Sequence, residues 1–203
     1  MLAAVACSCL NAPSSGQAAE ELSKRRTSEY ANDLCGICHL LPGSAKGPDK
    51  ERAPRIAAQQ RAYIEAQLNA FRQQSRREPE AYDCMWGLSS ALSDDLVVAL
   101  AGYFASRPPD PGISGDAVWI DKGRRLFQRD GQPGPTPSCA QCHGKDAAGA
   151  GATPRLAGQL APYLNRQLHV IRAKFRASGV MHGAAQELSD DEMHWIAEYL
   201  QSL

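Results

Sequence analysis

Two pairs of cysteines, each followed by a histidine, are the residues of this sequence best suited to chemistry. The two motifs comprise Cys35, Cys38 and His39, and Cys139, Cys142 and His143. Thiols at this spacing lie on one side of a helical turn, where they can form thioethers with the two vinyl groups of a haem. The imidazole that follows can then bind the iron. The spacing therefore predicts two covalently attached c-type haems, with His39 and His143 as iron ligands.

Zinc and disulfide chemistry are the alternatives for these cysteines. Two Cys-x-x-Cys pairs can hold one zinc ion, and a single pair can form a disulfide or a thioredoxin-like redox centre. The two pairs here lie 104 residues apart, and each has its own adjacent histidine. Neither alternative requires that histidine twice in the same place, so haem attachment is the favoured interpretation.

A methionine sulfur is the expected sixth ligand of each iron. Met85 and Met181 occupy equivalent positions in the two halves of the chain, and each is predicted to lie in a loop before a last helix. His182 is the main alternative at the second iron, but Trp86 stands at the equivalent position in the first half. An iron with His on one face and Met on the other has a raised reduction potential and no free coordination position for a substrate. This ligation favours electron transfer over catalysis.

The two halves of the chain are copies of one unit. The block Pro-Arg-Ile-Ala-Ala-Gln at 54–59 matches Pro-Arg-Leu-Ala-Gly-Gln at 154–159, and Leu-Ser-Asp-Asp at 92–95 matches the same residues at 188–191. Apolar residues recur at helical spacing, and Ser93 and Ser189 are predicted helix N-caps. We therefore expect an all-α fold with two tandem domains, residues 20–107 and 113–203, joined by a Pro-rich linker at 108–112.

Three pairs of equivalent residues are predicted to support the haems. Pro54 and Pro154 can offer carbonyl oxygens to the Nδ1–H groups of the iron-binding histidines. The candidates for holding haem propionates are Arg55, Arg155, Tyr63 and Tyr163. A solvated surface position is the alternative for the two arginines.

Charge and hydropathy argue against two classes of protein. Lys+Arg and Asp+Glu both number 22, and neither half is strongly basic, so nucleic-acid binding is not expected. No run of 18 apolar residues occurs, so no transmembrane helix is predicted. Residues 1–19 are predicted to be an export leader with a cleavage site among the small residues 16–19, although no basic residue precedes Lys24. Lipidation at Cys7 and a plain disordered terminus are the alternatives.

The combination of motifs resembles the cytochrome c4 family. The resemblance rests on the repeated Cys-x-x-Cys-His, the block at 154–159, the segment Tyr-Leu-x-x-Gln-Leu at 163–168 and the Met with Leu-Ser-Asp-Asp that ends each half. It implies a periplasmic dihaem electron carrier of the respiratory chain, with two cytochrome c-like domains related by a pseudo-twofold axis. It also implies a quinol-oxidising complex or a dehydrogenase as electron donor and a terminal oxidase as acceptor. Leu40 and Ala58 depart from the pattern of the second half.

Two other functions stay open. One is the cytochrome subunit of a periplasmic dehydrogenase, of the sulfide-oxidising flavocytochrome type. The other is a thiosulfate-oxidising cytochrome in which Cys84, next to Met85, is a thiolate ligand; Val180 stands at the equivalent position, which favours an apolar haem wall instead. Peripheral membrane association is also open. The candidates for steering an acidic partner are Arg72, Arg76, Arg77, Arg172, Lys174 and Arg176.

Overall fold

The computed structural model describes residues 15–39, 53–129 and 137–203, and the regular elements of these residues are helices. The first half contains α1 (Ser15–Tyr30), the π-helical segment η1 (Ala31–Cys35), α2 (Gly36–His39), α3 (Arg61–Arg72), the π-helical segment η2 (Ala81–Met85), α4 (Trp86–Ser90) and α5 (Asp94–Ala105). The second half contains α6 (Ala117–Gln128), α7 (Cys139–His143), α8 (Ala161–Arg172), α9 (Gly179–Glu187) and α10 (Asp190–Gln201). No strand occurs in these described ranges, which confirms the all-α prediction.

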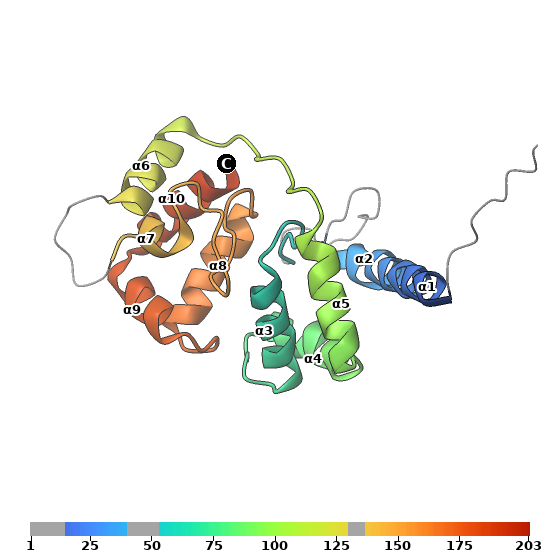
Figure 1. Cartoon of the computed structure of the whole chain (residues 1–203). Coiled ribbons are helices and arrows are strands. Elements are labelled where there is room, and N and C mark those ends of the chain that lie inside the picture. The colour runs from blue at the N-terminus through green and yellow to red at the C-terminus, as the bar shows by residue number, and fades with distance from the viewer. Residues whose placement is uncertain (1–14, 40–52, 130–136) are drawn as a thin grey trace, which may run out of the picture.

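The two halves form two helical bodies that lie side by side, with α3 of the first facing α8 of the second (Figure 1). Residues 1–14 of the predicted leader and Leu40 lie outside the described residues, and residues 15–19 form the start of α1. Among the described helices, none is by itself long and apolar enough to cross a membrane. Two neighbouring helical segments, Ala81–Ser90 and Asp94–Ala105, reach that length and hydropathy only when they are counted together, and the chain bends by 116° between them.

The predicted N-caps begin the last helix of each half. The Ser93 hydroxyl accepts a hydrogen bond from the Leu96 N–H at 3.3 Å, and acidic residues follow in the first turn of α5. Ser189 and Glu192 form the predicted capping box at the start of α10, with side-chain to backbone distances of 3.2 and 2.9 Å. These bonds satisfy N–H groups that a helix cannot satisfy internally, so they fix where each helix starts.

A glycine lets the first and last helices of the second half cross in backbone contact. A Cβ atom placed on Gly123 of α6 would lie 1.9 Å from the carbonyl oxygen of Trp195 and 2.8 Å from the Cβ of Tyr199 in α10. Next to this crossing, the Phe127 and Tyr199 rings pack with centroids 5.6 Å apart. The absence of a side chain at Gly123 is therefore what allows α6 and α10 to pack so closely.

The corresponding helix of the first half follows a different course. Arg26 takes the place of that glycine, and its side chain is exposed. Because a residue with a bulky side chain cannot enter a backbone crossing, α1 meets α5 less closely and projects away from the rest of the molecule (Figure 1). Tyr30, at the end of α1, still packs on the core of the first half.

Each half has its own apolar core. The first core gathers Ala31, Ile64, Leu92, Val97, Leu100, Ala101 and Phe104. The second gathers apolar residues of α6, α8 and α10, including Phe127, Leu164 and Leu200. Met193, which has no methionine at its equivalent position, is fully buried in a smaller cluster with Ile171 and Ala185. Separate cores are what two folded domains require.

Candidate haem-binding sites

The two predicted iron-binding histidines have the same environment. The Nδ1 atom of His39 lies 2.9 Å from the carbonyl oxygen of Pro54, and that of His143 lies 3.0 Å from the carbonyl oxygen of Pro154. A carbonyl can only accept, so each Nδ1 carries the proton and the lone pair resides on Nε2, the nitrogen available to a metal. Burial lowers the pKa of both imidazoles, against the opposing effect of the proline carbonyls, and this keeps the rings neutral.

The four motif cysteines are free thiols in short helices. Cys35 ends η1 and Cys38 lies in α2, while Cys139 and Cys142 lie in α7. Burial raises the pKa of the Cys35 thiol to about 11 and also raises the pKa of Cys139. Cys38 and Cys142 are exposed. Unpaired thiols one helical turn apart, next to an imidazole with Nε2 available, fit the attachment of haem c.

The two predicted methionine ligands lie in helical segments, so the loops expected around them are wrong. Met85 is the last residue of η2, and Met181 lies in α9. Gly87 and Gly183, which suggested loops, are accommodated inside α4 and α9. A short helix can contain a single glycine when tertiary contacts hold it. A π-helical turn, which is frequent at functional sites, ends at Cys35 and another ends at Met85.

The predicted propionate residues lie at the contact between the two halves. The Arg55 guanidinium donates to the carbonyl oxygens of Pro111 at 2.9 Å and Gly158 at 2.8 Å, both through Nη1. The buried Nε of Arg155 has no hydrogen-bond partner among the described residues. Tyr163 is buried, and the Tyr63 hydroxyl accepts from the guanidinium of Arg176 in the other half. An orphaned buried donor at Arg155 fits an anionic group such as a haem propionate.

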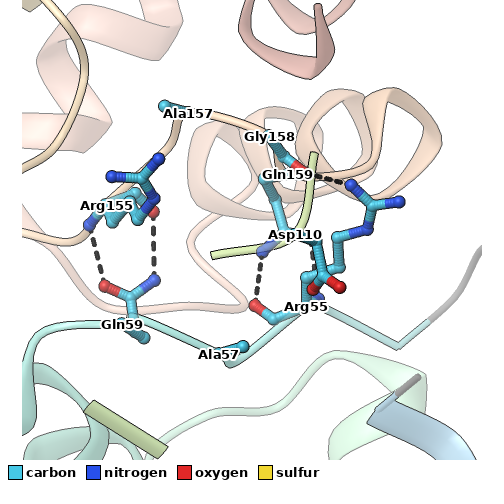
Figure 2. A pocket seen from close by; sticks show the side chains of 8 residues that line it. All are labelled: Arg55, Ala57, Gln59, Asp110, Arg155, Ala157, Gly158 and Gln159. Carbon is cyan, nitrogen blue, oxygen red and sulfur yellow. Dashed lines mark hydrogen bonds between the residues drawn. The ribbon is translucent and has the colours of Figure 1, made fainter. Parts of the chain in front are cut away.

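Two glutamines join the halves by reciprocal hydrogen bonds (Figure 2). The side-chain amide of Gln59 accepts from the Arg155 N–H at 2.7 Å and donates to the Arg155 carbonyl at 3.0 Å. Gln159 forms the same two bonds with the backbone of Arg55, both at 2.8 Å. Gln59 and Gln159 are equivalent in the repeat, so the contact has pseudo-twofold symmetry. The sequence signal for this role is the glutamine that ends both Pro-Arg blocks, and its role between the halves was not predicted.

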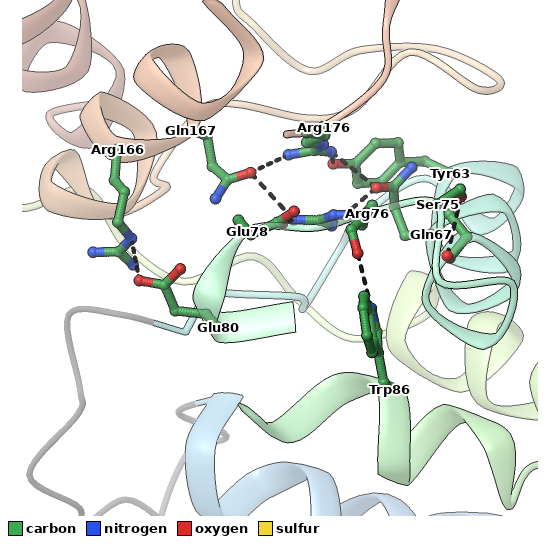
Figure 3. Close-up of polar contacts among 11 residues, drawn as sticks. Tyr63, Gln67, Ser75, Arg76, Glu78, Glu80, Trp86, Arg166, Gln167 and Arg176 are labelled. Carbon is green, nitrogen blue, oxygen red and sulfur yellow. Dashed lines mark hydrogen bonds and ion pairs between the residues drawn. The ribbon is translucent and has the colours of Figure 1, made fainter. Parts of the chain in front are cut away.

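Two arginines predicted to steer an acidic partner are instead enclosed between the halves (Figure 3). Arg76 is 7% exposed, and its guanidinium pairs with Glu78. Arg176 donates to Gln167 at 2.5 Å and to Gln67 at 3.0 Å. Burial alone would lower the pKa of Arg176, but Tyr63, Tyr163 and Glu78 raise it above its ordinary value. The steering role is wrong for these two residues because the docked halves cover them.

Two more of the predicted steering residues hold the last helices in place. Arg72 donates to the Leu92 carbonyl at 3.2 Å and forms an ion pair with Asp94 at 2.7 Å. Arg172 repeats both contacts in the second half, with the Leu188 carbonyl at 3.4 Å and Asp190 at 2.7 Å. Arg72 therefore ties α3 to the start of α5, and Arg172 ties α8 to the start of α10. Arg77 and Lys174 remain exposed.

Comparisons with known proteins agree with this site chemistry. The cytochrome c family model matches residues 120–203. The chain is 36% identical over 180 residues to cytochrome c4 from Thiocapsa roseopersicina, covering 85% of this chain and 88% of that protein. It is 34% identical over 170 residues to cytochrome c-552 from Acidithiobacillus ferridurans, covering 83% and 73%. The solved structure of cytochrome c4 from Acidithiobacillus ferrooxidans matches with a TM-score of 0.75 at 33% identity, covering 83% of this chain and 98% of that one.

A relative with a more specific name is also similar over most of its length. The thiosulfate dehydrogenase electron acceptor of Thiomonas intermedia is 31% identical over 174 residues, covering 82% of this chain and 76% of that protein. Together, the helical fold, the two equivalent sites and these similarities define a dihaem c-type cytochrome, an electron-transfer protein with two covalently bound haem c groups. Its two cytochrome c-like domains are related by a pseudo-twofold axis. The chain belongs to the cytochrome c4 family.

Proposed function

We propose that this protein is a periplasmic electron carrier that accepts electrons from a quinol-oxidising complex or a dehydrogenase and passes them to a terminal oxidase. The observation that supports this most directly is that both halves carry the same set of candidate haem ligands. Each half offers a neutral histidine held by a proline carbonyl, two thiols and one methionine at equivalent positions. An iron with both axial positions filled exchanges electrons and leaves no position for a substrate.

The proposal assigns a task to each site residue. Residues 20–107 form the first haem domain, residues 113–203 form the second, residues 108–112 link them, and residues 1–19 direct export. Thioethers form at Cys35, Cys38, Cys139 and Cys142, and the axial ligands are His39, Met85, His143 and Met181. Pro54 and Pro154 orient the imidazoles. The haem propionates are held by the unpaired Nε of Arg155 and by the phenols of Tyr63 and Tyr163. Arg55 also binds a propionate, through the guanidinium nitrogens that do not donate to Pro111 and Gly158.

Bound haem supplies the one-electron redox couple, and the protein controls how that couple works. Each proline carbonyl holds a proton at Nδ1 of its histidine, which increases the electron density that Nε2 offers to the metal. The apolar cores pack against Cys35 and Cys139 of the attachment motifs, and the methionine sulfur favours a raised reduction potential.

The carrier role is tested by reconstitution. The haem-loaded protein, added to washed membranes that contain a quinol-oxidising complex and an oxidase, should restore quinol-dependent oxygen consumption in proportion to its concentration. The same protein with both methionines replaced by alanine is the matched control. No stimulation by the native protein, with both haems reducible by dithionite, would contradict the proposed role.

The exported protein should carry two haems that cannot be extracted. Because thioether bonds are covalent, intact mass spectrometry should show the mature chain plus two haem masses, and acid–acetone should leave the colour with the protein. Replacement of Cys139 and Cys142 by alanine should remove one haem mass and leave the first site loaded. A native mass with a single haem would rule out the equivalence of the two motifs.

The electron acceptor of a thiosulfate dehydrogenase is the second candidate function, favoured by the similarity to the Thiomonas intermedia protein. It requires a donor enzyme but no thiosulfate chemistry on this chain. Reduction of this protein by a purified thiosulfate dehydrogenase, compared with reduction by a quinol-oxidising complex, separates the two donors. A flavoprotein donor, as in sulfide-oxidising flavocytochromes, is tested in the same assay.

Replacing Cys84 by valine should leave both haems in their native ligation. Cys84 is exposed, and valine stands at the equivalent position as Val180. The substitution should change stability by about 1 kcal/mol or less, because it conserves volume and orphans no buried polar group. Redox titration should show two high-potential haems in both the native protein and Cys84→Val. A separate assay should show no thiosulfate oxidation by either protein. A large rise in the first-haem potential in Cys84→Val would instead identify a thiolate ligand.

A further inference from the structure

Trp86 connects the segment of Met85 to a fixed point of the chain. Trp86 directly follows Met85 and is the first residue of α4. Its indole N–H donates to the carbonyl oxygen of Arg76 at 2.8 Å, and its ring packs on Tyr82 with centroids 5.8 Å apart. Figure 3 shows the indole reaching from α4 toward Arg76. The position of the methionine segment therefore depends on where this carbonyl is held.

The backbone at Arg76 is held by the second domain. Arg76 and Arg176 form an isolated antiparallel bridge across the interface. The next N–H, that of Arg77, donates to the Phe175 carbonyl at 2.8 Å. The carbonyl that accepts from Trp86 thus belongs to the same peptide unit as the Arg77 N–H, which is bound to the second domain.

The side chain of Arg76 strengthens this attachment. Its guanidinium donates to Gln67 at 3.0 Å in its own domain and to Gln167 at 3.2 Å in the other. It also stacks on the Phe71 ring at 4.2 Å from the centroid and pairs with the buried Glu78. A charged side chain with hydrogen-bond partners in both domains resists separation of the domains, because separation would break its bond to Gln167.

Among the described residues of the second domain, the equivalent position makes a contact within its own domain. His182 stands where Trp86 stands in the first domain, and its Nδ1 lies 3.1 Å from the carbonyl oxygen of Ile171. Ile171 is in α8 of the same domain, packed in the cluster that also contacts Met181. The segment of Met181 is therefore held from within its own domain, whereas that of Met85 is held through the interface.

We propose that Trp86 is a positioning residue that couples the ligation of the first haem by Met85 to the docking of the second domain. This inference rests on the proposed role of Met85 as an axial ligand. When the second domain is docked, the Arg76 carbonyl holds Trp86 and the start of α4, and Met85 is kept in its binding position. When docking loosens, the anchor moves and Met85 is released more often, while Met181 is unaffected.

The first experiment replaces Trp86 by phenylalanine in the full-length, haem-loaded protein. Loss of one hydrogen bond should raise the fraction of first haems with a dissociated methionine about tenfold. The measurements are the proton NMR signals of the two axial methionine methyl groups, assigned with Met85→Ala and Met181→Ala, and the extent of carbon monoxide binding. His182→Phe is the matched control, and it should alter only the Met181 signal.

The second experiment perturbs the anchor from the other domain. Gln167→Leu removes an acceptor shared by Arg76 and Arg176, and it should weaken the Met85 signal more than the Met181 signal. Combined with Trp86→Phe, it should have little additional effect, because the connection is already broken. Trp86→His, which restores a ring N–H, should recover part of the native signal. Haem content and helical circular dichroism verify that each variant is folded.

The outcomes separate this inference from the function it rests on. An unchanged Met85 signal in Trp86→Phe, or equal effects of Gln167→Leu on both signals, would overturn the coupling while leaving the carrier function intact. A Met85→Ala variant with two native methionine signals would instead overturn the ligand assignment itself.

Discussion

Met85→Ala is expected to convert the first haem from a closed to an open iron. The native reduced protein should bind almost no carbon monoxide, because a thioether sulfur fills each sixth position. The variant should bind one carbon monoxide per chain, lose half of the thioether-to-iron absorption in the oxidised state, and show a lower potential at that haem. Met181→Ala should produce the same changes at the second haem.

The two variants serve as controls for each other, since each leaves the other site intact. The double variant should bind two carbon monoxide molecules per chain. His182→Ala tests the alternative ligand at the second iron. If Met181 is the ligand, a methionine-to-iron band should persist at that haem, although loss of the bond from His182 to the Ile171 carbonyl should alter the Met181 signal. A native spectrum in either methionine variant would show that another residue binds that iron.

Gly123→Ala should destabilise the protein strongly, whereas a methyl group added at Gly87, Gly102 or Gly179 would meet no atom within 4 Å. The new Cβ would lie 1.9 Å from the Trp195 carbonyl oxygen, a backbone atom that can move only if α6 and α10 separate. Overpacking of this kind costs about 3 kcal/mol, and more where backbone is displaced. Guanidinium unfolding followed by circular dichroism should show the loss in the transition of the second domain.

Gly102→Ala is the matched control in the first domain. Gly102 also lies inside a helix, α5, but a Cβ there would meet no atom within 4 Å. Removing a helix-interior glycine without a clash should stabilise the protein by about 0.5–1 kcal/mol. Equal effects of the two substitutions would mean that the α6–α10 crossing is not in backbone contact.

The sequence by itself determined the chemistry that depends on local spacing. Two cysteines and a histidine within five residues are placed by one helical turn, so the attachment motifs could be predicted without knowing the fold. Ser189 and Glu192 likewise form their capping box within a single turn. The repeat also indicated two similar domains.

Only the tertiary structure decided what the equivalent surfaces of those domains do. Arg76 and Arg176 look like any solvated basic residues in the sequence. Docking of the two copies buried Arg76 with Glu78 and left Arg176 half-buried against Gln67 of the first half. The helical state of the Met85 and Met181 segments was also decided there, since isolated helices this short are unstable without packing. The bond from Trp86 to Arg76 joins residues ten apart, with η2 between them. Such contacts depend on the path of the whole chain, and for that reason residue spacing alone could not predict them.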